Sequence, residues 1–297
     1  MPGWCTIRWR FTSAWPTSSL SMCKRRGNMG QEVVDKMEAV WRSIDALCAN
    51  LTDEQWKTPT DCPNWSVQDQ LSHLCAGEHG LLGRPPVSHT PRDVSHVKNE
   101  MGERNEANVD YRRSRSGPEV LAEFRELTAE RMSVLRAMSD DDFAAETMTP
   151  LGPGTVQGLI EIRAFDAWTH EQDMRGALQQ PGHLDGPVAE HSVERCASAM
   201  PFVVGRKAQA PDGSTVVFVV TGAAGQTISV AVEGKRAKLV KTPPVDPTVR
   251  LTMDVETFTR LGCGRWAPAT SLQAGKVQIE GDQTLGETIV NQMAFMV

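Results

Sequence analysis

The sequence lacks several features that would place it in a specialised class of protein. No window approaches 18 uncharged apolar residues, so no segment is predicted to span a membrane. The seven cysteines are widely spaced and include no CxxC pair, which excludes a zinc ribbon and a thioredoxin-type motif. Basic charge is not in excess, since the net charge is -6 at pH 7. We therefore expect a cytoplasmic protein with free thiols and no nucleic-acid or membrane partner.

Acidic residues are absent from residues 1–31, although the chain as a whole is acidic. This stretch holds five basic residues and three of the eight tryptophans. A secretory signal would need an apolar run after its basic residues, and none is present. A transit peptide would match this stretch in its composition but in no other feature. We interpret residues 1–28 as an unstructured leader or a mis-assigned start, with translation beginning at Met22 or Met29.

The chain of 297 residues is long enough for about two domains. Apolar residues recur at three- and four-residue steps in four segments, which predicts helices over residues 31–51, 66–82, 118–138 and 155–178. Ser66 is a suitable N-cap for the second helix, with Asp69 completing a capping-box-like pair. The polar residues 84–116 are expected to form a long loop with some helix. Together these segments predict a four-helix bundle over residues 29–182.

The pattern changes after Gly186, where short β-branched runs replace the helical periodicity. A helix over residues 191–206 is followed by runs at 214–222 and 226–234 that predict a hairpin. Further strands over 248–254 and 276–282 alternate with two helices. Residues 183–297 are therefore expected to form a smaller α+β domain, so the fold class is α+β overall, with the bundle first.

Two of the predicted helices carry polar residues that could bind a metal ion. In the fourth helix these residues recur at i, i+3, i+7 and i+10, which places them on one face. The residues concerned are Asp69, His73, Arg163, Asp166, His170 and Asp173. Imidazole nitrogen and carboxylate oxygen suit zinc, and Asp166 and His170 would present two ligands one turn apart. With His73 as the third ligand, a fourth position would stay open, as in catalytic zinc sites.

The same spacings have a simpler interpretation that the sequence leaves open. Asp166 and His170 could form an ordinary i,i+4 pair on an exposed helix, and Arg163 with Asp166 a surface ion pair. Asp69 could be only a helix cap. Arg265 of the second domain could reach across to the bundle.

Two segments carry a family resemblance. CPNWSVQDQLSHL contains a Trp-(Ser/Thr)-Val-x-Asp-x-x-x-His pattern, and RAFDAWTHEQDMR an Arg-x-x-acid-x-x-x-His-x-x-Asp pattern. In this order they resemble the mycothiol-dependent maleylpyruvate isomerase family, whose members share a DinB-like four-helix bundle. The ending LQAGKVQIEGDQTLGETIV resembles the sterol-carrier-like domain that follows the bundle in many members. The resemblance covers residues 31–297 and leaves residues 1–28 unmatched.

The resemblance implies a metal site and a thiol cofactor. By position, the zinc ligands of the family fall on His73, Asp166 and His170, where the characterised isomerase type has Glu in place of Asp166. Asp69, Arg163 and Asp173 become candidates for orienting those ligands. Zinc or another divalent metal would activate mycothiol as a thiolate. The thiolate would add to a small electrophile in an isomerase or S-transferase reaction.

Two other functions stay open at this point. The chain could be a non-catalytic metal-containing protein that holds an apolar small molecule, or a two-domain module with a structural metal. As an enzyme it would take a small-molecule electrophile and a low-molecular-weight thiol as partners. Either a monomer or a homodimer is compatible with the sequence.

Deleting residues 1–28 is expected to leave folding and metal content intact, because the first predicted helix and the family resemblance both begin after this segment. Circular dichroism and metal analysis of the full-length and shortened proteins check this expectation. A loss of either property would show that the segment contributes to the fold.

Overall fold

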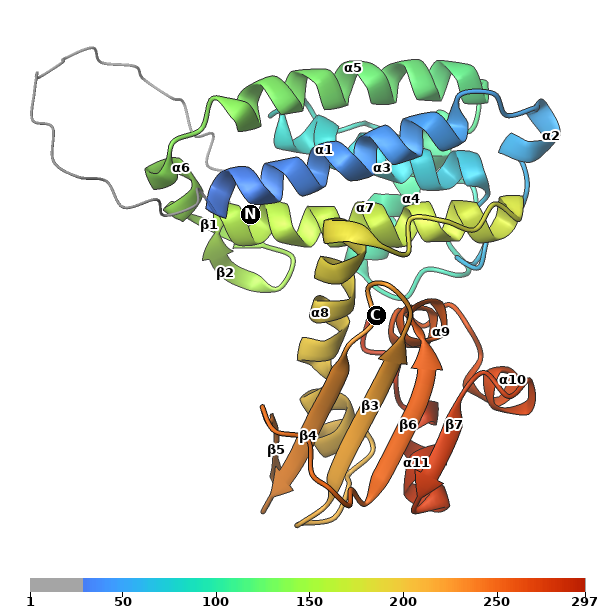
Figure 1. Ribbon diagram of the computed structural model, residues 1–297. Helices are drawn as coiled ribbons and strands as arrows, with labels where there is room; N and C mark the ends of the chain where they lie inside the picture. Colours follow the sequence, from blue (N-terminus) through green and yellow to red (C-terminus); the bar gives the residue numbers. More distant parts are fainter. Residues whose placement is uncertain (1–28, 297) are drawn as a thin grey trace, which may run out of the picture.

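The computed structural model describes residues 29–296, which form a helical bundle and a smaller domain with a five-stranded sheet (Figure 1). The long helices of the bundle are α1 (Met29–Cys48), α3 (Val67–Leu81), α5 (Gly117–Arg136) and α7 (Val156–Leu178). Its shorter elements are α2 (Asp53–Trp56), α4 (Glu100–Arg112), α6 (Asp140–Ala144) and the antiparallel hairpin of β1 (Glu146–Thr149) and β2 (Gly152–Thr155).

The apolar stripes predicted from the sequence pack together as the core of the bundle. Ile44 of α1, Leu71 of α3, Leu127 of α5 and Trp168 of α7 are all fully or almost fully buried. Burying a side chain of this size stabilises the fold by about 1.5–3 kcal/mol. The four long helices are therefore held by their shared apolar faces.

The start of α3 is fixed by a reciprocal cap. Ser66 Oγ accepts a hydrogen bond from the Asp69 backbone N–H, and Asp69 Oδ2 accepts one from the Ser66 backbone N–H at 2.9 Å. This capping box confirms the expected start of the helix. A fixed start also sets the rotation of the helix, and hence which side chains of α3 face α7.

The smaller domain packs helices against one sheet. Its strands are β3 (Thr215–Thr221), β4 (Thr227–Glu233), β5 (Arg236–Leu239), β6 (Val249–Asp254) and β7 (Gln278–Gly281). Its helices are α8 (Gly186–Pro201), which a π-helical turn over Phe202–Lys207 continues, α9 (Val255–Gly262), α10 (Pro268–Gln273) and α11 (Gln283–Asn291). The strand order is β5-β4-β3-β6-β7, with β3 and β6 parallel and the other neighbours antiparallel.

Helix α8 connects the two parts of the molecule. It runs from the bundle down behind the sheet (Figure 1). His191 Nε2 hydrogen-bonds to the Glu161 carbonyl oxygen of α7 at 2.9 Å, and the Arg195 guanidinium lies 5.6 Å from the centre of the Phe165 ring. The predicted domain boundary at residues 182 and 183 falls between α7 and α8 and stays a prediction.

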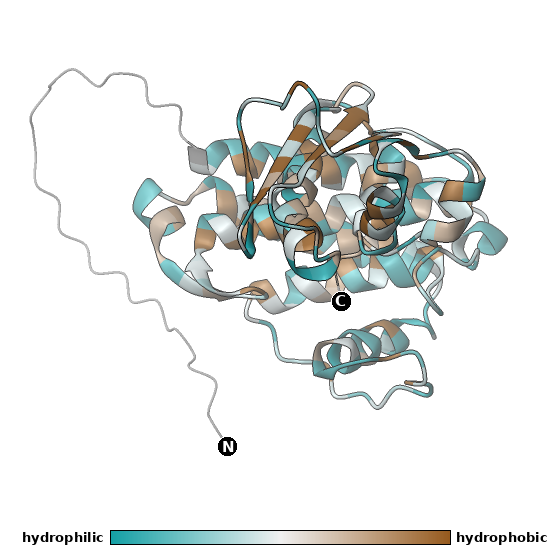
Figure 2. Ribbon diagram, turned by 90° about the horizontal axis from the view of Figure 1, so that it is seen from below, coloured by the Kyte–Doolittle hydropathy of each residue, from teal (hydrophilic) through white to brown (hydrophobic). Residues whose placement is uncertain are grey.

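Hydropathy follows this architecture. Figure 2 shows brown, apolar stretches along the strands of the sheet and on the bundle helices, with teal on many of the loops. Val216, Val217 and Phe218 of β3 are completely buried. Among residues 29–296, none of the helices is long and apolar enough to cross a membrane.

The predicted fold class is confirmed, and so is the hairpin of β3 and β4. Several short features were not predicted as such: the hairpin of β1 and β2 where a turn was expected, strand β5, and the helices α2, α6 and α10. Helix α4 lies within the polar segment expected to be mainly loop. Its buried residues are mostly charged, Val109 being the one aliphatic residue among Glu106, Asp110 and Arg112, so hydrophobic periodicity gives no signal for it.

Gly117→Ala is expected to destabilise the protein, because a Cβ at this position would overlap the buried indole of Trp56. Overpacking of this kind costs about 1–3 kcal/mol and lowers the melting temperature. Thermal unfolding followed by circular dichroism measures the change.

Gly80→Ala is the matched control, since a Cβ there has no atom within 4 Å. It should leave the melting temperature unchanged or raise it, because alanine favours the helix by up to about 1 kcal/mol. Equal melting temperatures for Gly117→Ala and the parent protein would contradict the packing described.

Candidate metal centre

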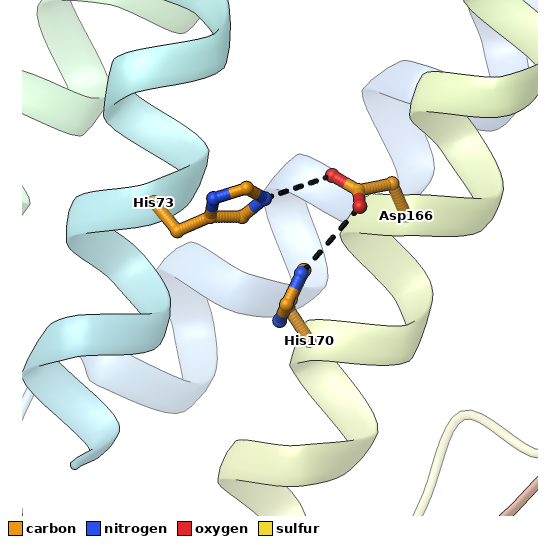
Figure 3. A group of neighbouring side chains, drawn as sticks. All are labelled: His73, Asp166 and His170. Carbon is orange, nitrogen blue, oxygen red and sulfur yellow. Dashed lines mark ion pairs between the residues drawn. The ribbon is translucent and has the colours of Figure 1, made fainter. Parts of the chain in front are cut away.

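Helices α3 and α7 bring His73, Asp166 and His170 to one point (Figure 3). His73 Nε2 lies 3.4 Å from Asp166 Oδ2, and His170 Nε2 lies 3.5 Å from Asp166 Oδ1. One ligand atom from each residue lies within 4.8 Å of the others. Ligands of a tetrahedral zinc ion lie about 3.3 Å apart, given bond lengths of about 2.0–2.1 Å. The spacing of the three side chains therefore fits a small divalent ion.

His73 carries the clearest sign that a ligand belongs between these residues. Both of its ring nitrogens are buried, and neither has a hydrogen-bond partner within residues 29–296. An unpaired buried polar group costs about 1–3 kcal/mol. Burial and the neighbouring His170 lower the pKa of His73, so its imidazole is neutral at neutral pH and has a lone pair free. A metal ion would satisfy that lone pair.

Asp166 is held by a chain of buried charges. Arg163 Nη1 donates to Asp166 Oδ2 at 2.5 Å, and its Nε and Nη2 donate to Glu78 Oε1 at 3.2 and 3.0 Å. Arg131 Nε donates to the other oxygen of Glu78 at 3.2 Å. Burial would raise the pKa of Asp166, but the neighbouring groups, with the charge of Arg163 foremost, lower it to well below its usual value. The carboxylate is therefore ionised and correctly charged to bind a cation.

His170 is oriented by a residue that the sequence analysis missed. Gln70 Oε1 accepts a hydrogen bond from His170 Nδ1 at 2.5 Å, which leaves the lone pair of Nε2 directed at Asp166. Gln70 Nε2 donates to Thr60 Oγ1 at 2.6 Å, and Thr60 Oγ1 donates to the Trp65 carbonyl oxygen. This series of hydrogen bonds sets which end of the Gln70 amide faces His170. Gln70 lies one turn before His73 on the same face of α3. This position could have identified it from the sequence as a residue near the site.

Trp65 covers the two imidazoles. The centre of its ring lies 5.3 Å from that of His73 and 6.0 Å from that of His170. Its indole N–H donates to Glu106 Oε2 of α4 at 2.9 Å. Glu106 was also missed, because it belongs to the polar segment that was expected to be mainly loop.

Of the three predicted orienting residues, Arg163 contacts a ligand directly, as described, whereas Asp69 and Asp173 have other partners. The oxygens of Asp69 bind Ser66 and, at 3.0 Å, Arg113 Nε, so Asp69 is a helix cap. Asp173 Oδ2 lies 3.7 Å from His170 Nδ1, beyond hydrogen-bond distance.

Asp173 instead binds two arginines of the smaller domain. Its Oδ1 accepts from Arg260 Nη1 at 2.8 Å, and its Oδ2 from Arg265 Nε at 2.9 Å. Arg265 therefore reaches from the smaller domain to the bundle, where it binds Asp173 and not one of the candidate metal ligands.

Gln70→Leu is expected to change the tautomer of His170, because it removes the acceptor of the Nδ1 proton. In the metal-free parent protein, nitrogen NMR of His170 should show a proton on Nδ1 and none on Nε2. In the variant, the proton should be shared between the two nitrogens.

Gln68→Leu is the control, since Gln68 is equally buried on α3 but donates to the carbonyl oxygens of Arg112 and Arg115. It should leave the His170 tautomer unchanged. A proton on Nε2 in the parent protein, or the same tautomer in Gln70→Leu, would refute the role of Gln70.

Comparison with known proteins agrees with this architecture. The crystal structure of the mycothiol-dependent maleylpyruvate isomerase, and that of a histidine-to-alanine variant of it, each align with 84% of this chain and 92% of their own, at 14% identity and a TM-score of 0.52. Sterol carrier protein 2 like 2 from Aedes aegypti aligns with 34% of this chain and 96% of its own, at 18% identity and a TM-score of 0.28. No curated protein sequence matches the chain significantly.

Two family models match successive parts of the chain. The mycothiol maleylpyruvate isomerase N-terminal domain matches residues 37–175, and the MDMPI C-terminal domain matches residues 190–288. These matches span most of the bundle and of the sheet domain, in the order in which the structure has them. The protein therefore belongs to the mycothiol maleylpyruvate isomerase family of enzymes.

Proposed function

We propose that the protein is a divalent-metal-dependent isomerase or S-transferase that uses mycothiol and acts on a small electrophile. The observation that carries this proposal is the convergence of His73, Asp166 and His170, with both ring nitrogens of His73 buried and without a partner in the described part of the chain. Three protein donors leave room for a further ligand, as in catalytic rather than structural sites. Two imidazoles and a carboxylate make zinc the first choice of metal.

The charges around the site favour an anionic ligand. Asp166 and Glu78 are balanced by Arg163 and Arg131, and burial keeps His73 neutral. The chain therefore offers no net negative charge to offset a divalent ion. When bound, such an ion lowers the pKa of a coordinated thiol and supplies a thiolate as nucleophile. A thiolate would also neutralise part of the charge of that ion.

Cys62, whose pKa is affected by Asp166 and Asp173, is unsuited to be the nucleophile. Burial raises the pKa of Cys62 to about 11, although Arg265 acts in the opposite direction. Cys62 is therefore protonated at neutral pH and lacks the thiolate that nucleophilic attack requires. Cys62 therefore does not supply the nucleophilic sulfur, which agrees with a low-molecular-weight thiol such as mycothiol as co-substrate.

For maleylpyruvate, the thiolate adds to one carbon of the cis double bond and turns it into a single bond. Rotation about that bond and expulsion of the same thiolate give the trans isomer, so the thiol is regenerated. His73, Asp166 and His170 would hold the metal ion that positions the sulfur, and Trp65 would shield one side of the site from water. With another electrophile, the same thiolate would displace a leaving group or open an epoxide.

We further propose that the protein works in the cytoplasm. All five cysteines of the described residues are free, which agrees with a reducing compartment. A monomer or homodimer without nucleic-acid or membrane partners stays our prediction.

Metal analysis of the purified protein tests the site first. We expect about one divalent ion per chain, and its loss in His73→Ala, because two remaining donors hold zinc poorly. Mycothiol-dependent conversion of maleylpyruvate, or adduct formation with a panel of small electrophiles, should be lost with the metal. His79→Ala is the control, as His79 lies on the same helix but hydrogen-bonds to the Pro85 carbonyl oxygen.

The outcomes separate the candidate functions. A parent protein without metal, or a His73→Ala variant that keeps it, would refute the metal site. Bound metal without turnover of any electrophile would instead favour a metal-containing binding protein.

A further inference from the structure

The smaller domain binds a buried carboxylate of the bundle that lies next to the metal centre. Asp173 lies one turn after His170 on α7, and its side chain is fully buried. It binds Arg260, at the end of α9, and Arg265, just beyond α9. Arg260 also donates to the Gln172 carbonyl oxygen, so it contacts both the backbone of α7 and this carboxylate.

The same part of the smaller domain contacts the loop before α3. Trp266 Nε1 donates to Asp61 Oδ2 at 3.1 Å, and Arg260 Nη1 lies 3.5 Å from the same oxygen. This loop also provides Thr60, which orients Gln70, and Trp65, which covers the imidazoles. Residues 260–266 thus contact both segments that flank the centre.

By binding the Asp173 carboxylate, Arg260 and Arg265 keep it from accepting a hydrogen bond from His170. Asp173 Oδ2 lies 3.7 Å from His170 Nδ1, only slightly beyond the range of a hydrogen bond. A carboxylate is a stronger acceptor than an amide, so an unpaired Asp173 would compete with Gln70 for the Nδ1 proton. Rotation of the ring toward Asp173 would turn Nε2 away from Asp166.

We propose that Arg260 and Arg265 are positioning residues, through which the smaller domain keeps His170 aligned for metal binding. The inference rests on the proposed function, because it concerns the same metal site. In this proposal the smaller domain influences metal binding in the bundle, in addition to packing against it. Groups that orient a metal ligand usually change metal affinity about 10- to 100-fold when removed.

Binding of Co²⁺ to the full-length protein tests the proposal, because its visible spectrum reports the geometry of the ligands. Arg265→Met should raise the Co²⁺ dissociation constant at least about tenfold and change the spectrum. Adding Asp173→Asn to this variant should recover much of the affinity, because the competing carboxylate is gone. Arg265→Lys should recover part of it, because it keeps a positive charge.

Arg195→Met is the matched control. Arg195 lies at the same junction of the domains, against Phe165, and does not pair with Asp173. It should bind Co²⁺ with the affinity and spectrum of the parent protein. If Arg265→Met does not fold, Trp266→Phe replaces it, because the loss of one hydrogen bond to Asp61 should weaken binding about two- to tenfold.

The results separate this proposal from the proposed function. A parent protein that binds no Co²⁺ would overturn the metal site itself. Unchanged binding by the Arg265 and Trp266 variants, an equal loss in Arg195→Met, or no recovery with Asp173→Asn would overturn the positioning role and leave the metal site standing.

Discussion

Asp166 lies between two imidazoles on one side and the guanidinium of Arg163 on the other, inside a bundle whose remaining contacts are mainly apolar. Ionised groups in such a place are costly unless each is paired. Much of the surrounding structure provides those pairs. Within residues 29–296 neither ring nitrogen of His73 has a hydrogen-bond partner, which suits a metal ligand.

The partners of these groups come from separate parts of the molecule. Arg163 leads through Glu78 to Arg131 of α5, and the carbonyl oxygen that fixes Thr60 belongs to Trp65 in the loop before α3. Trp65 in turn depends on Glu106 of α4. A polar helix, a loop and a buried ion pair therefore act together at one point. This arrangement explains why α4 is ordered although it buries little apolar surface.

The sequence predicted those parts of the site that depend on a single helix. The spacing of Asp166 and His170 along α7, and the place of His73 on an amphipathic helix, were enough to propose the ligands. The apolar stripes likewise predicted the bundle. Gln70 and Glu106 were missed because their roles depend on which helix they face. The pairing of Asp173 with Arg260 and Arg265 was not foreseen because these arginines come some ninety residues later. Pairings over such separations follow from tertiary packing and not from local pattern.

Gly77 of α3 has no side chain, and this leaves the space that the long side chain of Arg163 occupies. The guanidinium of Arg163 lies where a Cβ of residue 77 would be, so the bare backbone of α3 forms the surface on which it rests. A methyl group there would push away the arginine that neutralises Asp166. A side chain at position 77 would thus disturb the charge pairing of Arg163 with Asp166, although glycine has no charge and no polar side chain to contribute.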